Sequence, residues 1–284
     1  MLLKIYSITI ILLDVFVLLA KCFYATFEGL YYLIFPPAEK SVAGEVVLIT
    51  GTGHGIGREL AIQFAELGAT VVCVDINSEG NDETIQMIKD KGLNRVYPYD
   101  CDVSNEEDVQ DVVELITKEV GPVTVLVNNA GIMPCRHFMD YKPEEIQKIF
   151  QVNVFAHFWL LREILPSMIK NNYGHIVALS SMAGVIGLRN LVPYCSSKFA
   201  VRGMMEALAE ELREECIGTD INFTCIFPYM VNTGLCKKPR VRFPGMLAMV
   251  SPKTAAKLII QAVRRNTMAI SIPNWYLVVH DIVR

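Results

Sequence analysis

The sequence contains no pair of cysteines spaced as Cys-x-x-Cys, and its five histidines show no metal-ligand spacing among themselves or with the eight cysteines. These absences argue against a structural zinc site, and we predict no metal. They also argue against a disulfide framework. Cys73 and Cys225 lie in apolar runs, where buried free thiols are expected, so we place the catalytic domain in a reducing compartment.

A basic excess is also absent, because the formal net charge is −4. A protein without a positive field has no general attraction to phosphate backbones, so we expect no nucleic-acid partner. The sequence shows no internal repeat and no low-complexity tract, which argues against solenoids and disordered tails. With 284 residues the chain has room for one large α/β domain and an appendage.

Residues 1–36 differ in composition from everything that follows. Neither of their two apolar runs alone reaches the roughly 20 residues of a membrane-spanning helix. A cleaved signal peptide is one interpretation, but Leu18-Leu19-Ala20 offers no small-x-small cleavage site. A core helix of a soluble domain is another. We favour a retained hydrophobic membrane anchor over residues 1–36, a linker over 37–44 and a catalytic domain over 45–284.

From residue 45 onward, short apolar runs alternate with helical periodicity. Such alternation predicts a single-domain α/β fold with a doubly wound parallel sheet of the Rossmann type. The expected strands lie at 46–49, 70–74, 96–99, 123–127, 175–179, 221–226 and 269–272. The expected helices lie at 58–67, 82–91, 106–120, 143–170, from 194 onward and at 252–265.

A glycine-rich stretch follows the first expected strand and opens the first helix. Glycines there permit a tight turn and close approach of the backbone to a pyrophosphate, which the free N–H groups of the helix attract. The predicted cofactor-binding residues in this stretch are Gly51, Thr52, His54, Gly55, Ile56 and Gly57. Asp75 ends the second strand, where a carboxylate accepts ribose hydroxyls and repels a 2′-phosphate, so we predict NAD as the cofactor.

Tyr194 and Lys198 are four positions apart on an expected helix. They therefore lie on one face, where a cation favours the phenolate and brings the pKa of the phenol towards neutrality. Alone, such a pair is more often an ordinary helix surface. Together with the glycine loop upstream and Ser181 at a strand end, it predicts a catalytic site.

These motifs jointly resemble the short-chain dehydrogenase/reductase family over about residues 44–275. The pieces that carry the resemblance are Thr50 to Gly57, Asn128-Asn129-Ala130-Gly131, Asn153, Ser181 and Tyr194-x-x-x-Lys198. The resemblance implies that Asp102 and Val103 hold the adenine and that Asn129, Ala130 and Gly131 border the cofactor. It also implies that Pro228, Val231 and Thr233 hold the nicotinamide, although Tyr229 stands where the family usually has glycine.

The resemblance further implies a catalytic tetrad. Tyr194 would be the general acid or base, Lys198 would lower its pKa, Ser181 would orient the substrate oxygen and Asn153 would hold a water. Two histidines, His137 and His157, lie near these motifs in the sequence but are not expected to belong to the tetrad. We interpret His157 as a satisfied, partly buried histidine, whereas His137 and its neighbour Arg136 lie in a loop that could border substrate.

The segment between Thr233 and Ser251 occupies the usual place of the substrate lid in this family. It carries four cations and then a run of apolar residues, namely Lys237, Lys238, Arg240, Arg242, Phe243, Met246, Leu247, Met249 and Val250. An exposed basic loop is one interpretation. The other is a lid that rests on an anionic bilayer and faces a lipophilic substrate.

The apolar N-terminus, Lys40 to Glu45 and Pro193 to Ala200 resemble the membrane-associated 16C branch, whose members oxidise retinol, steroids or other lipid alcohols. We therefore predict an NAD-dependent dehydrogenase of a lipophilic alcohol, such as a retinol-like or steroid substrate. It would lie on the endoplasmic reticulum membrane or lipid droplets, with a cytosolic catalytic domain, as a homo-oligomer. The alternatives are an NADPH-dependent keto-lipid reductase and a catalytically silent membrane scaffold.

Overall fold

A computed structural model describes residues 2–215, 217, 220–234 and 249–277. The chain divides into two units, Met1–Glu39 and Lys40–Arg284. The first contains helix α1 (Leu2–Ile34), and the second contains the sheet and the helices that cover it. Each unit is described below by itself.

Helix α1 includes a stretch of 21 residues, Thr9–Gly29, with a mean hydropathy of 2.1. By length and composition this stretch is sufficient to cross a membrane. Its large apolar side chains are exposed, with Phe16 at 68% and Leu19 at 63%.

A seven-stranded parallel sheet forms the centre of the second unit, in the order β3-β2-β1-β4-β5-β6-β7. Its strands are β1 (Val46–Thr50), β2 (Thr70–Asp75), β3 (Val96–Asp100), β4 (Val125–Asn128), β5 (Gly174–Leu179), β6 (Ile221–Pro228) and β7 (Ala269–Ile272). The strand order reverses between β1 and β4, which leaves a crevice at the carboxyl ends of these two strands. The doubly wound fold expected from the sequence is confirmed.

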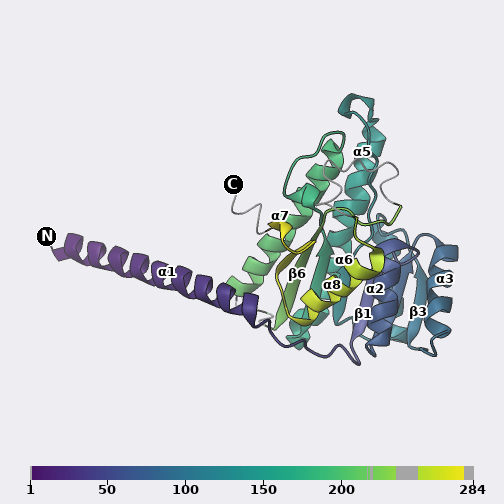
Figure 1. Cartoon of the computed structure of the whole chain (residues 1–284), viewed down its shortest axis with the longest axis horizontal. Helices are drawn as coiled ribbons and strands as arrows, with labels where there is room; N and C mark the ends of the chain where they lie inside the picture. Colours follow the sequence, from purple (N-terminus) through teal and green to yellow (C-terminus); the bar gives the residue numbers. More distant parts are fainter. Residues whose placement is uncertain (1, 216, 218–219, 235–248, 278–284) are drawn as a thin grey trace. The chain divides into compact units, whose positions relative to one another are not determined.

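Helices cover both faces of the sheet. The principal ones are α2 (Gly55–Glu66), α3 (Ser78–Lys89), α4 (Glu106–Glu119), α5 (Pro143–Phe150), α6 (Ala156–Asn171), α7 (Val192–Glu214) and α8 (Pro252–Arg264). One core cluster joins the sheet to α2, α3 and α8, and α2 and α8 lie side by side on that face (Figure 1). The other cluster joins the sheet to α4, α6 and α7. Cys73 and Cys225 lie in these cores as the buried thiols expected from the sequence.

Local contacts explain two of the differences between the helices and their expected bounds. Helix α3 begins at Ser78 rather than near residue 82, because the side chain of Asn77 accepts the Gly80 N–H and caps the helix. The long helix expected over 143–170 contains a π-helical segment, η2 (Gln151–Phe155), between α5 and α6. Such segments recur at functional sites, and this one carries Asn153.

The residues just before β1 pack against the rest of the second unit. Lys40 donates its backbone N–H to Arg264 O at 2.8 Å, and Arg264 Nε donates to Lys40 O at 2.8 Å. Val42 is buried, and Lys40 Nζ lies 3.1 Å from His175 Nδ1. Burial, together with the charge of Lys40, lowers the pKa of His175 to about 3. The chain is thus fixed to the sheet from Lys40 onward.

Candidate active site

The glycine-rich turn between β1 and α2 brings two backbone segments into unusually close contact. A Cβ atom at Gly57 would lie 2.0 Å from Gly51 O, so only glycine fits there. Gly51 and Gly55 have φ values of +75° and +63°, which glycine adopts without strain. His54, at the N-cap of α2, provides no side-chain cap for the first turn. Backbone N–H groups at this end are therefore suited to bind a pyrophosphate.

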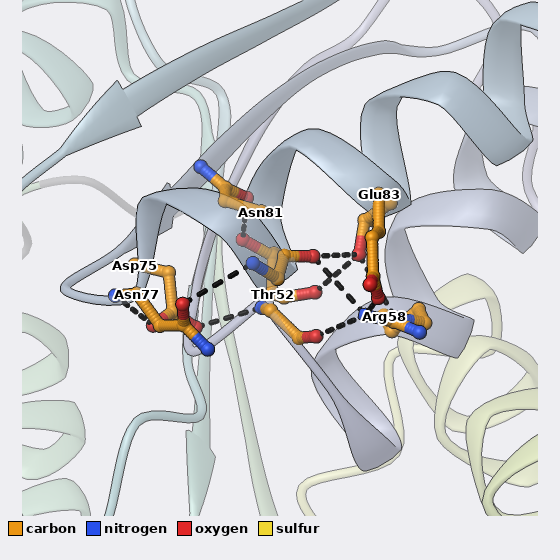
Figure 2. A network of polar contacts seen from close by, with 9 residues as sticks. Thr52, Arg58, Asp75, Asn77, Asn81 and Glu83 are labelled. Carbon is orange, nitrogen blue, oxygen red and sulfur yellow. Dashed lines mark hydrogen bonds and ion pairs between the residues drawn. The ribbon is translucent and has the colours of Figure 1, made fainter.

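Hydrogen bonds from α3 and β2 hold this turn in place (Figure 2). Thr52 Oγ1 donates to Asn81 Oδ1 at 2.7 Å. Arg58 donates to Gly53 O, to Thr84 Oγ1 at 3.0 Å and to Gly80 O at 3.1 Å. Arg58 also forms an ion pair with Glu83. The loop is therefore rigid before any cofactor arrives. This role of Arg58 was not expected from the sequence, although its position directly after Gly57 was the available signal.

Asp75 lies at the end of β2, beside the glycine turn. Its Oδ2 accepts the Gly53 N–H at 2.7 Å and its Oδ1 accepts the Asn77 N–H at 2.8 Å. Two backbone donors thus fix the carboxylate while each oxygen retains a lone pair for a ribose hydroxyl. In the described residues no lysine or arginine forms an ion pair with Asp75.

Asp102 has more protein partners than the sequence suggested. It accepts hydrogen bonds from Ser104 N at 3.0 Å and from Ser104 Oγ at 2.6 Å, and it forms an ion pair with Lys148 at 3.1 Å. Burial would raise the pKa of Asp102, but the Ser104 hydrogen bonds and Lys148 outweigh it and lower the pKa. The side chain of Val103 lies in the core. Lys148 therefore links α5 to the expected adenine end of the site.

The turn after β4 is attached to the glycine loop. Thr50 Oγ1 accepts the N–H groups of Asn129 and Ala130, each at 3.0 Å. Asn129 Nδ2 donates to Thr50 O at 2.8 Å and to Gly51 O at 3.2 Å. A Cβ atom at Gly131 would lie 3.3 Å from Asn153 Oδ1 and 3.6 Å from Lys198 Nζ. This turn therefore connects the phosphate loop with the expected catalytic residues.

The four expected catalytic residues are all buried near the carboxyl ends of β4 and β5. Tyr194 and Lys198 share one face of α7, and Lys198 Nζ lies 5.8 Å from the centroid of the Tyr194 ring. Lys198 Nζ donates to Leu179 O at 2.7 Å. Ser181 lies two residues after the end of β5, and its hydroxyl accepts the Ala183 N–H at 3.1 Å.

Asn153 uses its side chain to hold the loop after β4. Its Oδ1 accepts the Ile132 N–H at 2.8 Å, and its Nδ2 donates to Ile132 O at 3.0 Å and to Ser197 Oγ at 3.1 Å. Ser197 in turn donates to Tyr194 O at 2.7 Å. Asn153 therefore ties the π-helical segment to α7, one residue from Lys198.

Burial dominates the ionisation of the catalytic pair. It raises the pKa of Tyr194 to about 12, while a hydrogen bond with Ser181 acts in the opposite direction. Burial also lowers the pKa of Lys198 to about 8, against a smaller opposing effect of Cys225. The sequence suggested that Lys198 would bring the phenol pKa towards neutrality. In the protein alone, burial raises the phenol pKa instead, and it is Ser181 that opposes this rise.

The expected nicotinamide loop begins where β6 ends. Pro228 O accepts a hydrogen bond from Ser181 Oγ at 3.3 Å, which joins this loop to the catalytic serine. A Cβ atom at Gly55 would lie 3.0 Å from the Cβ of Thr233, so Thr233 sits against the start of α2. Val231 pairs with Val250 as an isolated bridge. The loop therefore lies between the glycine turn and the catalytic residues.

Tyr229 stands where the family usually has glycine, and its side chain packs in an aromatic stack. Its ring stacks on Tyr276 with centroids 5.0 Å apart, and Tyr276 stacks on Trp275 at 4.3 Å. The backbone N–H of Tyr229 donates to Ile272 O at 2.9 Å. This aromatic stack was not foreseen from the sequence, because its members are far apart in the chain.

Most of the expected lid lies outside the described residues. The lid residues concerned are Lys237, Lys238, Arg240, Arg242, Phe243, Met246 and Leu247. Of the remaining two, Met249 is exposed and Val250 is half-buried. A hollow of about 360 Å³ opens against α7, and its lining is mainly apolar: Gly187, Leu188, Val192, Cys195, Ser196 and Phe199. Leu188 also packs in the small cluster that contains Tyr194.

The interpretation of His157 was wrong. This residue is fully buried at 2% exposure, and its Nδ1 has no hydrogen-bond partner within the described part of the chain. Burial, with a contribution from Lys198, lowers the pKa of His157 to about 3. Arg136 instead pairs with Glu145 at 2.9 Å, while His137 is exposed.

A model of the family described as short chain dehydrogenase matches residues 45–241. Short-chain dehydrogenase/reductase family 16C member 6 from Bos taurus is 42% identical over 93% of this chain and 84% of its own length. Epidermal retinol dehydrogenase 2 from Mus musculus is 41% identical over 92% and 84%. Human 17-beta-hydroxysteroid dehydrogenase 13 is 39% identical over 93% and 87%.

Solved structures give the same picture. A short chain dehydrogenase/reductase from Burkholderia phymatum in complex with NAD superimposes with a TM-score of 0.76 and 25% identity, covering 85% of this chain and 93% of that one. A 3-ketoacyl-(acyl-carrier-protein) reductase from Brucella melitensis complexed with NADH gives a TM-score of 0.74 and 28% identity, covering 82% and 98%. The residues around the glycine turn fit a dinucleotide of this kind.

The close contact at Gly57 gives a direct test of the glycine turn. Gly57→Ala places a methyl group against Gly51 O, so we expect a loss of about 1–3 kcal/mol in the free energy of unfolding and at least tenfold weaker NAD binding. Gly203→Ala is the matched control. Nothing lies within 4 Å of a Cβ atom at that exposed position of α7, and alanine should stabilise the helix by about 0.5–1 kcal/mol. Thermal unfolding and NAD titration measure both effects, and unchanged NAD affinity in Gly57→Ala would contradict the assignment.

Proposed function

The chain belongs to the short-chain dehydrogenase/reductase family of oxidoreductases, and we propose that it is a membrane-anchored, NAD-dependent dehydrogenase of lipophilic alcohols. The observation that carries this proposal is the convergence of Ser181, Tyr194 and Lys198, all buried, beside a rigid glycine turn. Retention of this whole arrangement favours an enzyme over a silent scaffold.

The residues of the site divide the chemistry among them. NAD held by the glycine turn, Asp75 and the loop at Thr233 would supply the hydride acceptor for oxidation. Ser181 binds the substrate oxygen, and Tyr194 takes the hydroxyl proton as the alcohol becomes a carbonyl. Lys198 stabilises the phenolate that accepts this proton, because a cation nearby favours the charged form of the phenol. Reduction would use the same groups in reverse.

The raised pKa of Tyr194 and the lowered pKa of Lys198 are properties of the protein alone. A positively charged nicotinamide bound beside them would favour the phenolate, as any nearby cation does. With the cofactor bound, Tyr194 would ionise more readily and could accept a proton beside the charged Lys198. This arrangement suits a base that acts only when the cofactor is in place.

A lipophilic substrate is supported by apolar groups on the surface of the catalytic unit. The hollow against α7 is lined by Leu188, Val192 and Phe199. Phe138 and Met139, in the loop after β4, expose 52% and 87% of their surface. Exposed apolar groups near a site favour apolar ligands. The names of two relatives, a retinol dehydrogenase and a 17-beta-hydroxysteroid dehydrogenase, point to the same class of substrate.

Helix α1 supports a membrane location, because its stretch Thr9–Gly29 is long and apolar enough to cross a bilayer. We place the protein on the endoplasmic reticulum membrane or on lipid droplets, with the catalytic domain in the cytosol. We also propose a homo-oligomer. Exposed Phe155, Phe158 and Phe199 on the π-helical segment and helices α6 and α7 support such an association.

Replacement of Tyr194 tests the reaction. Tyr194→Phe removes the phenolic hydroxyl and leaves the ring, so we expect turnover to fall at least about 100-fold with NAD binding unchanged. NADH formation by the full chain reconstituted in membranes, with retinol, estradiol and long-chain alcohols, is the measurement. Turnover of one alcohol that survives the substitution would exclude Tyr194 as the base. The absence of turnover with either nucleotide, in a protein shown to bind NAD, would favour the scaffold.

Replacement of Asp75 tests the cofactor preference. Asp75→Ala removes the charge that repels a 2′-phosphate, so the ratio of kcat/KM for NADPH to that for NADH should rise about tenfold or more, or about 1.4 kcal/mol. Asp100→Ala is the control, because Asp100 ends the neighbouring strand β3 and contacts Ser78. An unchanged preference in Asp75→Ala would exclude Asp75 as the residue that selects the cofactor, whereas a preference of the unaltered protein for NADPH would favour the NADPH-dependent reductase.

Deletion of residues 1–36 tests the anchor and keeps the contacts of Lys40 with Arg264. We expect the shortened protein in the soluble fraction after cell lysis, whereas the full chain sediments with membranes and resists a carbonate wash. Thermal unfolding verifies that the shortened protein is folded. A shortened protein that remains on membranes would show that the principal tether lies in the second unit.

A further inference from the structure

The chain that leaves β3 runs past the carboxyl end of β2. Cys101 donates its backbone N–H to Asp75 O at 3.1 Å, and Asp102 follows directly. Asp75 is the residue proposed to accept the ribose hydroxyls of the cofactor. Because adenine is bonded to the ribose carbon next to the 2′-hydroxyl, the base must lie beside Asp75. Geometry therefore agrees with the family resemblance in placing Asp102 at the adenine end of the site.

Two carboxylates follow each other in this segment, and different elements hold them. Ser78 Oγ donates to Asp100 Oδ2 at 2.7 Å, so Asp100 is held at the start of α3. Asp102 is held instead by Ser104 and by Lys148 of α5. The orientation of Asp102 thus depends on a helix that is remote from it in the sequence.

Protein contacts leave the carboxylate of Asp102 with one acceptor position for a ligand. Its Oδ1 accepts two hydrogen bonds from Ser104, from the backbone N–H at 3.0 Å and from Oγ at 2.6 Å. Its Oδ2 accepts Lys148 Nζ at 3.1 Å. A carboxylate offers about four lone-pair positions, so within the described contacts one remains, on Oδ2. One N–H of an amino group requires one such position.

Lys148 determines where this remaining lone pair points. Its Nζ also donates to Ser104 Oγ at 2.7 Å, so lysine, serine and aspartate form a closed ring of hydrogen bonds. Ser104 alone would attach the carboxylate through Oδ1 and leave Oδ2 free to turn. The second attachment, from α5, fixes both oxygens.

We propose that Lys148 is a positioning residue of the adenine end of the site. It orients Oδ2 of Asp102 to accept the exocyclic amino group, and it thereby selects adenine over a purine with a carbonyl at that place. This inference rests on the proposed function, in which NAD is the cofactor. Hypoxanthine carries such a carbonyl, and its oxygen would face the carboxylate without a proton between them. A site built to hydrogen-bond one group discriminates strongly against an analogue that lacks it.

Partial exposure of this ion pair separates the two roles that Lys148 could have. The side chains of Lys148 and Asp102 are 47% and 31% exposed. Ion pairs in contact with solvent contribute little to folding stability. The effect of Lys148 should therefore appear in the recognition of the base and not in the melting temperature.

The test measures the dissociation constants of NAD and of nicotinamide hypoxanthine dinucleotide without substrate, for the full chain reconstituted in membranes. The unaltered protein should bind NAD about tenfold more tightly than the hypoxanthine analogue. Lys148→Met should weaken the binding of NAD about three- to fivefold and leave that of the analogue within about twofold. The melting temperature without ligand should be unchanged.

Asp102→Ala completes a double-mutant cycle. It removes the acceptor, so it should abolish the preference for NAD, and adding Lys148→Met to it should change neither constant further. Lys91→Met is the matched control, because Lys91 forms an ion pair of similar exposure with Glu66, away from Asp102. This variant should leave both dissociation constants unchanged.

An undiminished preference for NAD in Lys148→Met would overturn the inference. An equal loss of affinity for both dinucleotides would overturn it too, because a purely structural role does not distinguish the two bases. Failure of the proposed function has a different signature. Loss of the preference in Lys148→Met, in a protein that oxidises no alcohol, would support the inference and contradict the dehydrogenase. A protein that binds neither dinucleotide would overturn both proposals.

Discussion

A buried cation is the constraint on which the rest of this site depends. Lys198 is 4% exposed, and a charge so placed requires partners on every side. The Leu179 carbonyl supplies one, and the end of β5 must therefore stop where it does. The loop at Gly131 passes close to the ammonium, where a Cβ atom would lie 3.3 Å from Asn153 Oδ1, and the side chain of Asn153 holds Ile132 in this loop. The end of β5 and the loop after β4 thus both lie against one buried charge.

The sequence was sufficient for the fold and for the positions of the motifs. Strands of continuous apolar residues and the glycine turn were recognisable because they depend on local pattern. The start of α3 was missed by four residues, because the cap at Asn77 is a single side-chain contact. The π-helical segment was missed because its periodicity differs from an α-helix by one residue in a turn.

The environment of each site residue was harder to predict than its identity. The contact of Lys148 with Asp102 joins residues that are far apart in the chain. The burial of His157 depends on which side of α6 faces the sheet, and a short apolar helix does not reveal this. The pKa of Tyr194 reflects the balance of hydration and charge in three dimensions, which a spacing of four residues cannot give.

The π-helical segment η2 also sets how α6 is rotated about its axis relative to α5. One additional residue in a turn rotates everything beyond it by about 100° relative to a continuous α-helix. Asn153 lies within that segment, and His157 lies just after it on α6. The extra residue in η2 therefore sets the direction that each side chain of α6 faces. Loss of one residue between Gln151 and Phe155 would turn the following helix by the same angle and carry His157 away from the sheet, although no amino acid of the tetrad had changed.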